Sequence, residues 1–251
     1  MNIIIDGIKC EVKTGEYILD VAERNGINIP ALCHNEALPG QGVCRLCVVE
    51  VIEGKRRKIV ASCIFPIQKE IEVITNSERV RAIRKTIIML LSARIPGSQY
   101  LNKLKEEYGV QDTPRFKSDM KEECILCGLC VRACEEMGSC AISTVNRGIT
   151  KKVSTPYDEP SSVCIGCGAC AYVCPTGAIK MEEARGRRFI WNKEFELLKC
   201  YGCGEYFTTP EQAEYVREKL GMDKVELLCS KCKKVQTAEK LRDIYEGTGC
   251  K

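Results

Sequence analysis

Two runs of four cysteines in the middle of the sequence constrain the fold more than any other feature. Each run follows the pattern CxxCxxCxxxC, and the second is followed by Pro175. In such pairs of runs, three close thiolates hold one [4Fe-4S] cubane and the fourth Cys of each run crosses over to ligate the other cubane. Two cubanes are therefore expected, and the chain between the runs must fold back. The expected ligands are Cys124, Cys127, Cys130 and Cys174 for the first cubane and Cys164, Cys167, Cys170 and Cys134 for the second.

Small residues within the runs favour a loop that wraps a cluster. Gly128, Gly166 and Gly168 tolerate positive φ and close approach of the backbone to an inorganic cube. Structural zinc fits poorly here because zinc sites use two pairs of ligands rather than two runs of four. We therefore predict a dicluster domain of the bacterial-ferredoxin type over residues 118–182.

The composition limits the class of protein. The length of 251 residues allows one to three domains, and 19 cysteines favour several small ones. A secreted disulfide scaffold would need a signal peptide, which the opening MNIIIDGIKC lacks, so we expect a reducing cytoplasm. The net charge of +4 gives no reason to expect a nucleic-acid partner. No apolar run approaches the roughly 20 residues that cross a bilayer, so no transmembrane segment is expected.

The first 76 residues predict a small α+β domain. Residues 3–12 alternate in polarity around the turn signal Asp6-Gly7, which indicates a hairpin, and a helix follows that stops at Asn25-Gly26. Strand-like segments come next at 48–52, 59–61 and 71–74. A hairpin, a helix, a cysteine-bearing loop and further strands together predict a β-grasp domain over 1–76.

The cysteines of this domain carry a resemblance to a known family. The stretch Cys33-His34-Asn35-Glu36, the stretch GVCRLCVVEV at 42–51, and Ser62-Cys63 with Pro66 resemble the [2Fe-2S] domain at the head of the large iron–sulfur subunit of respiratory complex I. The same domain opens the small iron–sulfur subunit of NAD-linked hydrogenase diaphorase modules, and the iron–sulfur subunits of electron-bifurcating hydrogenases and formate dehydrogenases. Plant-type ferredoxins have four residues between their first two ligands, whereas ten separate Cys33 from Cys44.

The resemblance implies one [2Fe-2S] cluster, with zinc as the alternative occupant of the same cysteines. The implied ligands are Cys33, Cys44, Cys47 and Cys63. The single histidine, His34, directly follows a ligand and is interpreted as an ordinary loop residue or as a neighbour that tunes the cluster.

A helical linker is predicted over 77–117. Its first helix begins at the capping residue Ser77 and ends before Ile95-Pro96-Gly97, and a second helix is expected near 99–108. The apolar stripe of the first helix is expected to be buried and comprises Val80, Ile83, Ile87, Leu90 and Leu91. Its other face is basic and is expected to be solvated, with a docking surface as the alternative; it comprises Arg79, Arg81, Arg84 and Lys85.

One element of the resembling family is missing from this linker. Relatives of the complex I type often carry a His and three Cys after the first helix, and these bind an extra cubane. Between Arg94 and Glu123 this sequence has neither residue type. This extra cubane with mixed His and Cys ligands is therefore expected to be absent.

A third group of cysteines predicts a small metal-binding module over 183–251. Two CxxC pairs are typical of zinc ribbons and rubredoxins, and a helix beginning at Thr209-Pro210 lies between them. The expected ligands are Cys200, Cys203, Cys229 and Cys232. Structural Zn²⁺ is the favoured occupant, with rubredoxin-type iron or a further iron–sulfur cluster as alternatives. Since Zn²⁺ has no redox chemistry, this zinc-ribbon-like module would serve in docking or in stabilising the fold and would not carry an electron.

Three cysteines stay unassigned. Cys10 lies in a strand pattern and is expected to be buried as a small apolar residue. Cys140 follows the first run and could be mistaken for a ligand, and Cys250 is expected to be a free thiol near the end of the sequence.

The predicted function is electron relay, because the sequence offers several redox centres and no visible substrate site. A single histidine supplies little acid–base chemistry, so no catalytic residue is assigned. The resemblance implies a flavoprotein partner that binds FMN and NAD(P), a thioredoxin-like [2Fe-2S] subunit, and a catalytic subunit of the hydrogenase or formate dehydrogenase type, with ferredoxin as a further candidate. Electron bifurcation would require a flavin from the partner. The alternatives are an iron–sulfur subunit of a succinate dehydrogenase or fumarate reductase, and a free-standing multicluster ferredoxin.

Overall fold

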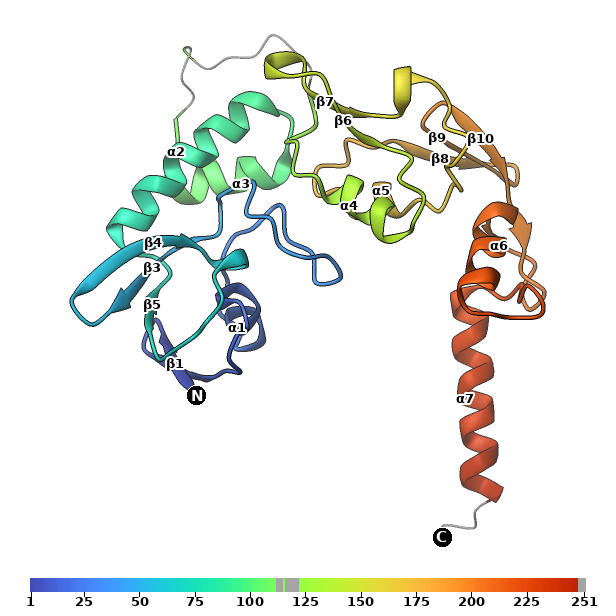
Figure 1. The fold of residues 1–251 in the computed structure, drawn as a ribbon, viewed down its shortest axis with the longest axis horizontal. Coiled ribbons are helices and arrows are strands. Elements are labelled where there is room, and N and C mark those ends of the chain that lie inside the picture. The colour runs from blue at the N-terminus through green and yellow to red at the C-terminus, as the bar shows by residue number, and fades with distance from the viewer. Residues whose placement is uncertain (112–114, 116–121, 248–251) are drawn as a thin grey trace.

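The computed structural model describes residues 1–111, 115 and 122–247, and the chain is built from cysteine-bearing loops held between small sheets and short helices (Figure 1). The part of the predicted linker around Thr113-Pro114 lies outside the described residues.

The N-terminal part is a five-stranded mixed sheet with a helix packed against it. The strand order is β2-β1-β5-β3-β4, in which β1 pairs parallel with β5 and antiparallel with β2. The elements are β1 Asn2–Ile5, β2 Ile8–Glu11, α1 Ile18–Arg24, β3 Val48–Glu53, β4 Arg56–Ala61, η1 Ser62–Ile64 and β5 Glu72–Ile74. The hairpin, the helix and the three later strands of the β-grasp prediction are confirmed.

The hairpin turn shows why the sequence signal was reliable. Asp6 and Gly7 both have left-handed φ values, 48° and 85°, as a two-residue hairpin turn of type I′ requires. The inward-facing residues Ile3, Ile5 and Cys10 then join the core between the sheet and α1. The expectation that Cys10 is buried is confirmed.

Two helices follow the sheet and cover its cysteine-bearing loop. They are α2 Glu78–Arg94 and α3 Gln99–Tyr108, and both were expected from the sequence. The Oγ of Ser77 accepts a hydrogen bond from the amide of Val80 at 3.3 Å, which caps α2 as predicted. Leu101 and Leu104 of α3 are buried in one core with Cys33 and Cys44, so these helices form a layer packed against the loop that carries the two cysteines.

The predicted faces of α2 were partly wrong. Leu90 was expected to be buried but is 47% exposed, whereas Arg84, expected on the solvated basic face, is 1% exposed. The Arg84 guanidinium donates to the carbonyls of Leu46 (3.1 Å) and Val48 (2.7 Å) and to the hydroxyl of Tyr108 (2.9 Å). A buried charge is tolerated where its donors are satisfied in this way, and hydrophobic periodicity alone could not reveal these partners.

The two cysteine runs form a second unit around a pair of short helices. The helices α4 Leu129–Glu136 and α5 Ala169–Tyr172 each begin within a run and pack against one another. The residues before them, Gly128 and Gly168, have left-handed φ values of 76° and 74°. The strands and turns around them are β6 Ser143–Val145, η3 Gly148–Thr150, β7 Lys152–Ser154, η4 Pro156–Asp158, β8 Met181–Ala184, β9 Arg187–Ile190 and β10 Lys193–Glu196.

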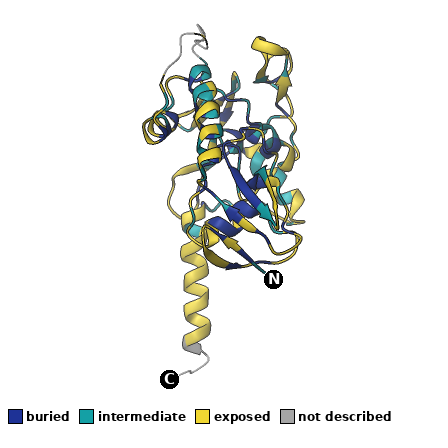
Figure 2. Cartoon of the chain, turned by 90° about the vertical axis from the view of Figure 1, so that its left-hand side faces the viewer, coloured by how far each residue is buried: buried dark blue, intermediate teal, exposed yellow. Residues whose placement is uncertain are grey.

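The C-terminal part combines a small hairpin with two helices. Its elements are β11 Leu198–Lys199, β12 Tyr206–Thr208, α6 Pro210–Lys219 and α7 Ser230–Gly247. The helix α7 extends away from the rest of the chain, and most of its described residues are exposed (Figures 1 and 2). Among the described helices, none combines the length and apolar character needed to cross a membrane.

Candidate iron–sulfur and metal centres

The first candidate centre is formed by the predicted [2Fe-2S] ligands. Cys33 and Cys44 lie in the loop between α1 and β3, Cys47 directly precedes β3, and Cys63 lies in η1. All four side chains are buried, and the Sγ atoms of Cys47 and Cys63 are 3.4 Å apart. The amide of Cys44 also donates to Cys33 Sγ at 3.3 Å. The structure thus brings the four predicted ligands together.

Hydrogen bonds among these four thiols lower the pKa values of two of them and raise those of the other two. Hydrogen bonds from the thiols of Cys44 and Cys63 lower the pKa of Cys33 to about 2. The thiol of Cys63 likewise lowers the pKa of Cys47 to about 6, while the pKa values of the donating thiols of Cys44 and Cys63 are raised. Because the thiolate is the form that ligates a metal, the lowered pKa values of Cys33 and Cys47 favour ligation by these two residues.

The loop around this centre leaves no room for larger side chains. A Cβ on Gly40 would lie 2.4 Å from the carbonyl oxygen of Cys63, and a Cβ on Gly42 would lie 2.7 Å from Ile64. Gly42 also has a left-handed φ of 63°. The backbone at Gly40 and Gly42 therefore packs tightly against the segment that carries Cys63.

The second candidate centre is a cavity of about 230 Å³ near the start of α4. Its lining includes Cys124, Cys127, Cys130 and Cys174. Cys174 comes from the second run, so the chain does fold back to join the triad of the first run. Hydrogen bonds hold the sulfurs here, for example from the amide of Leu126 to Cys124 Sγ at 3.3 Å.

The third candidate centre is a tighter apolar cavity beside α5. Its lining includes Cys134, Cys164, Cys167 and Cys170. Cys134 Sγ accepts a hydrogen bond from the amide of Ala141 at 3.2 Å, and Cys170 Sγ accepts one from the indole of Trp191 at 3.4 Å. Burial raises the pKa of Cys170 to about 11. The two crossed sets expected from the spacing are therefore each gathered around a separate cavity, and ligation by them stays a prediction.

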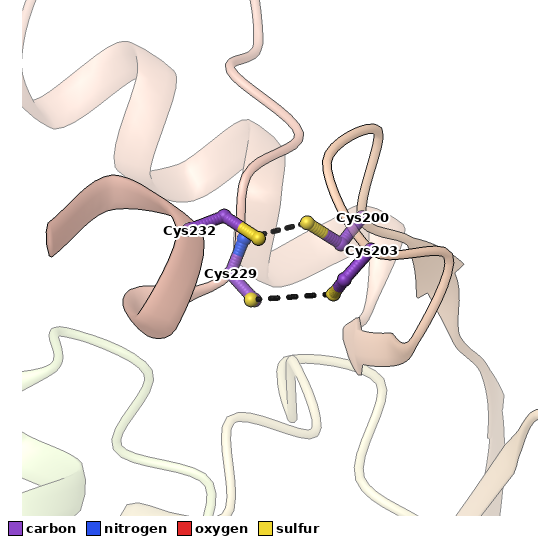
Figure 3. A group of neighbouring side chains, drawn as sticks. All are labelled: Cys200, Cys203, Cys229 and Cys232. Atoms are coloured by element: carbon purple, nitrogen blue, oxygen red, sulfur yellow. Dashed lines mark hydrogen bonds between the residues drawn. The ribbon is translucent and has the colours of Figure 1, made fainter. Parts of the chain in front are cut away.

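The fourth candidate centre is formed by the two C-terminal CxxC pairs (Figure 3). The sulfurs of Cys200, Cys203, Cys229 and Cys232 all lie within 4.8 Å of one another. Those of Cys203 and Cys229 are 3.7 Å apart, which matches the edge of about 3.8 Å expected for a tetrahedron with Zn–S bonds of about 2.3 Å. Across the described part of the chain, no other cysteine set is this compact, and a compact set fits one metal ion better than a cluster.

The fold of this module differs from a ribbon with two β-knuckles. The first pair lies in the turn between β11 and β12, whereas the second pair lies at the start of α7. Cys200 Sγ accepts hydrogen bonds from the amides of Cys229 (3.2 Å) and Gly202 (3.4 Å). The helix expected between the pairs is present as α6, capped by the Oγ of Thr209, which accepts from the amide of Gln212 at 3.1 Å.

The first two centres share one hydrophobic core. Cys33 and Cys44 of the first centre and Cys127 of the second belong to the same buried cluster, together with residues of α2, α3 and α4. Arg132 of α4 crosses between them and donates to the carbonyls of Cys33, at 3.3 Å, and Pro39. The first and second candidate centres are therefore joined by one buried core and by the hydrogen bonds of Arg132.

Two functional residues were missed by sequence reasoning. Arg132 was indistinguishable from any other basic residue on a helix. Trp191 lines both cubane cavities, but its only sequence signal was being the single tryptophan of the chain. Of the unassigned cysteines, Cys140 is exposed, and Cys250 lies outside the described residues.

His34 lies at the surface end of the [2Fe-2S] site. Its Nε2 is 3.4 Å from Oδ1 of Asp20 and 4.0 Å from Oε2 of Glu23. These side chains line an open pocket whose lining also includes Cys63. The first centre thus borders an open pocket that carries several acidic side chains.

Comparison with known proteins identifies two domains. A 2Fe-2S iron–sulfur cluster binding domain matches residues 1–78, and a 4Fe-4S dicluster domain matches residues 163–238. The second match begins just before the second cysteine run and extends over both C-terminal CxxC pairs.

Several characterised proteins are similar over most of the chain. The NADP-reducing hydrogenase subunit HndD of Solidesulfovibrio fructosivorans is 33% identical over 89% of this chain and 42% of its own length. The NADPH-Fe(3+) oxidoreductase subunit alpha of Geobacter sulfurreducens is 35% identical over 74% of this chain and 25% of its own length. The NADH-ubiquinone oxidoreductase 75 kDa subunit of Reclinomonas americana is 32% identical over 71% of this chain and 29% of its own length. The chain thus spans less than half the length of these relatives.

A solved structure shows a related fold. In an NAD+-reducing [NiFe]-hydrogenase in its H2-reduced state, one chain matches with a TM-score of 0.53 and 29% identity, covering 61% of this chain and 74% of that chain.

Proposed function

The chain is a homologue of subunits of NADP-reducing hydrogenase, NADPH-Fe(3+) oxidoreductase and NADH-ubiquinone oxidoreductase, and we propose that it is an electron-relay iron–sulfur subunit of a multisubunit NAD(P)-linked oxidoreductase. In this proposal it holds one [2Fe-2S] cluster, two [4Fe-4S] clusters and one structural Zn²⁺. The proposed ligands are the four cysteine sets gathered at the four centres described above.

The observation that carries the proposal is the continuity of the three redox sites. The ligands of the [2Fe-2S] site share a buried core with those of the first cubane site. The first and second cubane sites are in turn joined by Trp191 and by the packed helices α4 and α5. Electrons could therefore pass along one chain without an intermediate carrier.

The clusters supply one-electron chemistry when bound, and the protein supplies position and a dry environment. Leu46 and Ile88 are fully buried beside the [2Fe-2S] ligands, and Ile142 and Ile190 line the second cubane cavity. Backbone amides such as those of Leu126 and Ala141 donate to ligand sulfurs. The apolar side chains exclude water, and the amide donors stabilise the thiolate forms that would ligate iron.

Partner subunits complete the proposed complex. A flavoprotein that binds FMN and NAD(P) would exchange electrons with this chain, and a catalytic subunit of the hydrogenase or formate dehydrogenase type would use or supply them. A thioredoxin-like [2Fe-2S] subunit and ferredoxin are further candidates, and bifurcation would depend on the partner's flavin. We place the complex in the cytoplasm. The open pocket that reaches Cys63 is a suitable entry point for electrons from a docked partner.

Features of the C-terminal module favour a docked subunit over a free-standing carrier. The compact four-cysteine set supports a structural ion that is redox-silent. Helix α7 extends from this module with Val235 and Leu241 58% and 51% exposed. Apolar side chains presented on an extended helix are typical of surfaces that contact another protein.

The test is purification of the native complex under anaerobic conditions, with analysis of metals and of the chains that accompany this one. We expect about ten iron atoms and about one zinc per chain, from one [2Fe-2S] cluster, two cubanes and one Zn²⁺. Iron clearly above that number would exclude zinc from the C-terminal four-cysteine set. A monomer that purifies without a flavoprotein would exclude the proposed complex.

A further inference from the structure

Trp191 lies at the junction of the two cubane sites. It lines the cavity of the first cubane and also the cavity of the second. Its indole nitrogen donates to only one of the gathered ligand sets, through a hydrogen bond of 3.4 Å to Cys170 Sγ. Trp191 therefore contacts both cavities but donates its N–H to a sulfur of the second ligand set. This hydrogen bond suggests a role beyond packing.

A strained turn and several tethers fix this position. Trp191 and Asn192 form the two-residue turn between β9 and β10, and both have left-handed φ values, 53° and 57°, although neither is glycine. The next residue, Lys193, donates through Nζ to the carbonyls of Ser161 (3.1 Å) and Cys164 (2.8 Å). The hairpin is thus anchored to the loop that carries the second ligand set, and this anchoring supports a backbone conformation that residues other than glycine rarely adopt.

We propose that Trp191 selectively raises the reduction potential of the cubane held by Cys134, Cys164, Cys167 and Cys170. This proposal rests on the proposed function, because it assumes that both cubanes are present. One-electron reduction adds negative charge to a cluster and its thiolates, and a hydrogen-bond donor stabilises the more negative state. The donated proton stays on the indole nitrogen, and no bond forms or breaks when the electron arrives from the neighbouring cubane.

The unequal contact gives the proposal its specificity. The first cubane's sulfurs have other donors, including the amide of Leu126 and the hydroxyl of Thr176, which lies 3.6 Å from Cys174 Sγ. None of these contacts depends on the indole N–H. Removing that N–H should therefore change one potential and leave the other in place.

The decisive variant is Trp191→Phe, which removes the N–H and keeps an aromatic ring. Potentials are measured by redox titration with dithionite, following the EPR signal of each reduced cluster. At a fixed ambient potential, we expect the reduced-to-oxidised ratio of the second cubane to fall about tenfold, which corresponds to a shift of about 59 mV for a one-electron couple. The first cubane should shift far less. Equal shifts, or no shift, would overturn the proposal.

A second measurement detects the hydrogen bond in the native chain by isotope labelling. Because the chain has a single tryptophan, labelling with indole-¹⁵N tryptophan places ¹⁵N at one side chain only. We expect a weak ¹⁵N hyperfine coupling on the reduced second cubane, detected by pulsed EPR and lost in Trp191→Phe. Absence of this coupling in the labelled native chain would refute the hydrogen bond itself.

The control separates this proposal from the one on which it rests. Phe189→Leu alters an aromatic residue of β9, in the same hairpin, without touching the N–H donor. It should retain the native iron content and both native potentials, and Trp191→Phe should retain the iron content as well. If the unmodified chain lacks two cubanes, the proposed function fails. If it contains them and the potentials do not separate as described, only the role of Trp191 fails.

Discussion

At the scale of single residues, the crossing of Cys134 and Cys174 between runs is the sharpest feature of the dicluster unit. Cys174 lines the cavity of the first triad, and Cys134 lines the cavity of the second. Burial raises the pKa of Cys134, and Cys164 of the second triad contributes to this increase. The neighbouring Cys140 is exposed and serves as a matched control.

We expect Cys134→Ser to damage the cubane held by Cys164, Cys167 and Cys170. The iron content should fall by up to about four atoms per chain, because the second cubane loses one of its ligands. Mössbauer spectroscopy and EPR of the purified protein would identify the affected cluster. Cys140→Ser should leave both cubanes intact. Damage limited to the cluster of the 124–130 triad would contradict crossed ligation.

At the scale of elements, Thr209 links the C-terminal module to the second cysteine run. Its side chain is fully buried, caps α6 through Gln212, and donates to the carbonyl of Ile165 at 2.6 Å. Ile165 lies between two predicted ligands of the second cubane. The Thr209 hydroxyl therefore caps the start of α6 and also binds the loop that carries Cys164 and Cys167.

Thr209→Val should destabilise this junction by about 1–3 kcal/mol, because it removes a cap and leaves the partly buried carbonyl of Ile165 without its donor. Thr209→Ser keeps the hydroxyl and should lose much less. Thermal unfolding of the loaded protein under anaerobic conditions would measure the difference. If the two variants proved equally stable, the hydroxyl would have no such role.

Metal uptake by the C-terminal module should depend strongly on pH. Hydrogen bonds lower the pKa of Cys200 to about 6, and the bond from the amide of Cys229 has the largest effect. Hydrogen bonds with the other three thiols raise the pKa of Cys232 to about 12. The pKa of Cys203 is also raised. At pH 7 Cys200 is therefore already a thiolate, while Cys203 and Cys232 must each release a proton to bind the metal.

The apparent affinity for Zn²⁺ should rise as pH rises, by about 100-fold per pH unit near neutrality, because at least two protons leave on binding. Competition with a chelator at several pH values would measure this slope. An affinity that does not change with pH would show that the four thiols are already ionised in the metal-free module.

Element prediction from the sequence succeeded where local chemistry decides the structure. The hairpin at Asp6-Gly7, the cap at Ser77 and the helix 99–108 were all correct. The helix α2 was also predicted correctly, but the assignment of its faces was wrong for Arg84, which is buried through hydrogen bonds to Leu46, Val48 and Tyr108. Those partners lie 24 to 38 residues away along the chain, and no helical periodicity encodes them.

Much the same division applies to the candidate site. Cysteine spacing was sufficient to group the ligands, since thiolate geometry around clusters and metal ions is narrow. It could not identify the residues that join one centre to the next. Trp191 and Arg132 act through contacts made only after distant segments have packed together.

At the scale of the whole molecule, the [2Fe-2S] site and the first cubane site should be magnetically coupled. Cys33 and Cys127 share a core, and the charge of Cys33 contributes to the raised pKa of Cys127. In the fully reduced protein, we expect the EPR signals of these two clusters to be broadened and to relax faster than either would alone. Cys44→Ser, which removes a [2Fe-2S] ligand, should narrow the cubane signal. A cubane signal that is the same in both proteins would contradict direct contact between the sites.

The core shared by Cys33, Cys44 and Cys127 also bears on how the newly made chain matures. Arg132 bridges α4 to the loop carrying Cys33 and closes the core shared by Cys33, Cys44 and Cys127, so we expect cluster delivery to be easier before this interface forms. A chain that has received only one of the two clusters keeps an apolar surface uncovered, and proteases and chaperones recognise such surfaces. We therefore expect this interface to act during maturation as a checkpoint for complete loading, in addition to its proposed role in electron transfer.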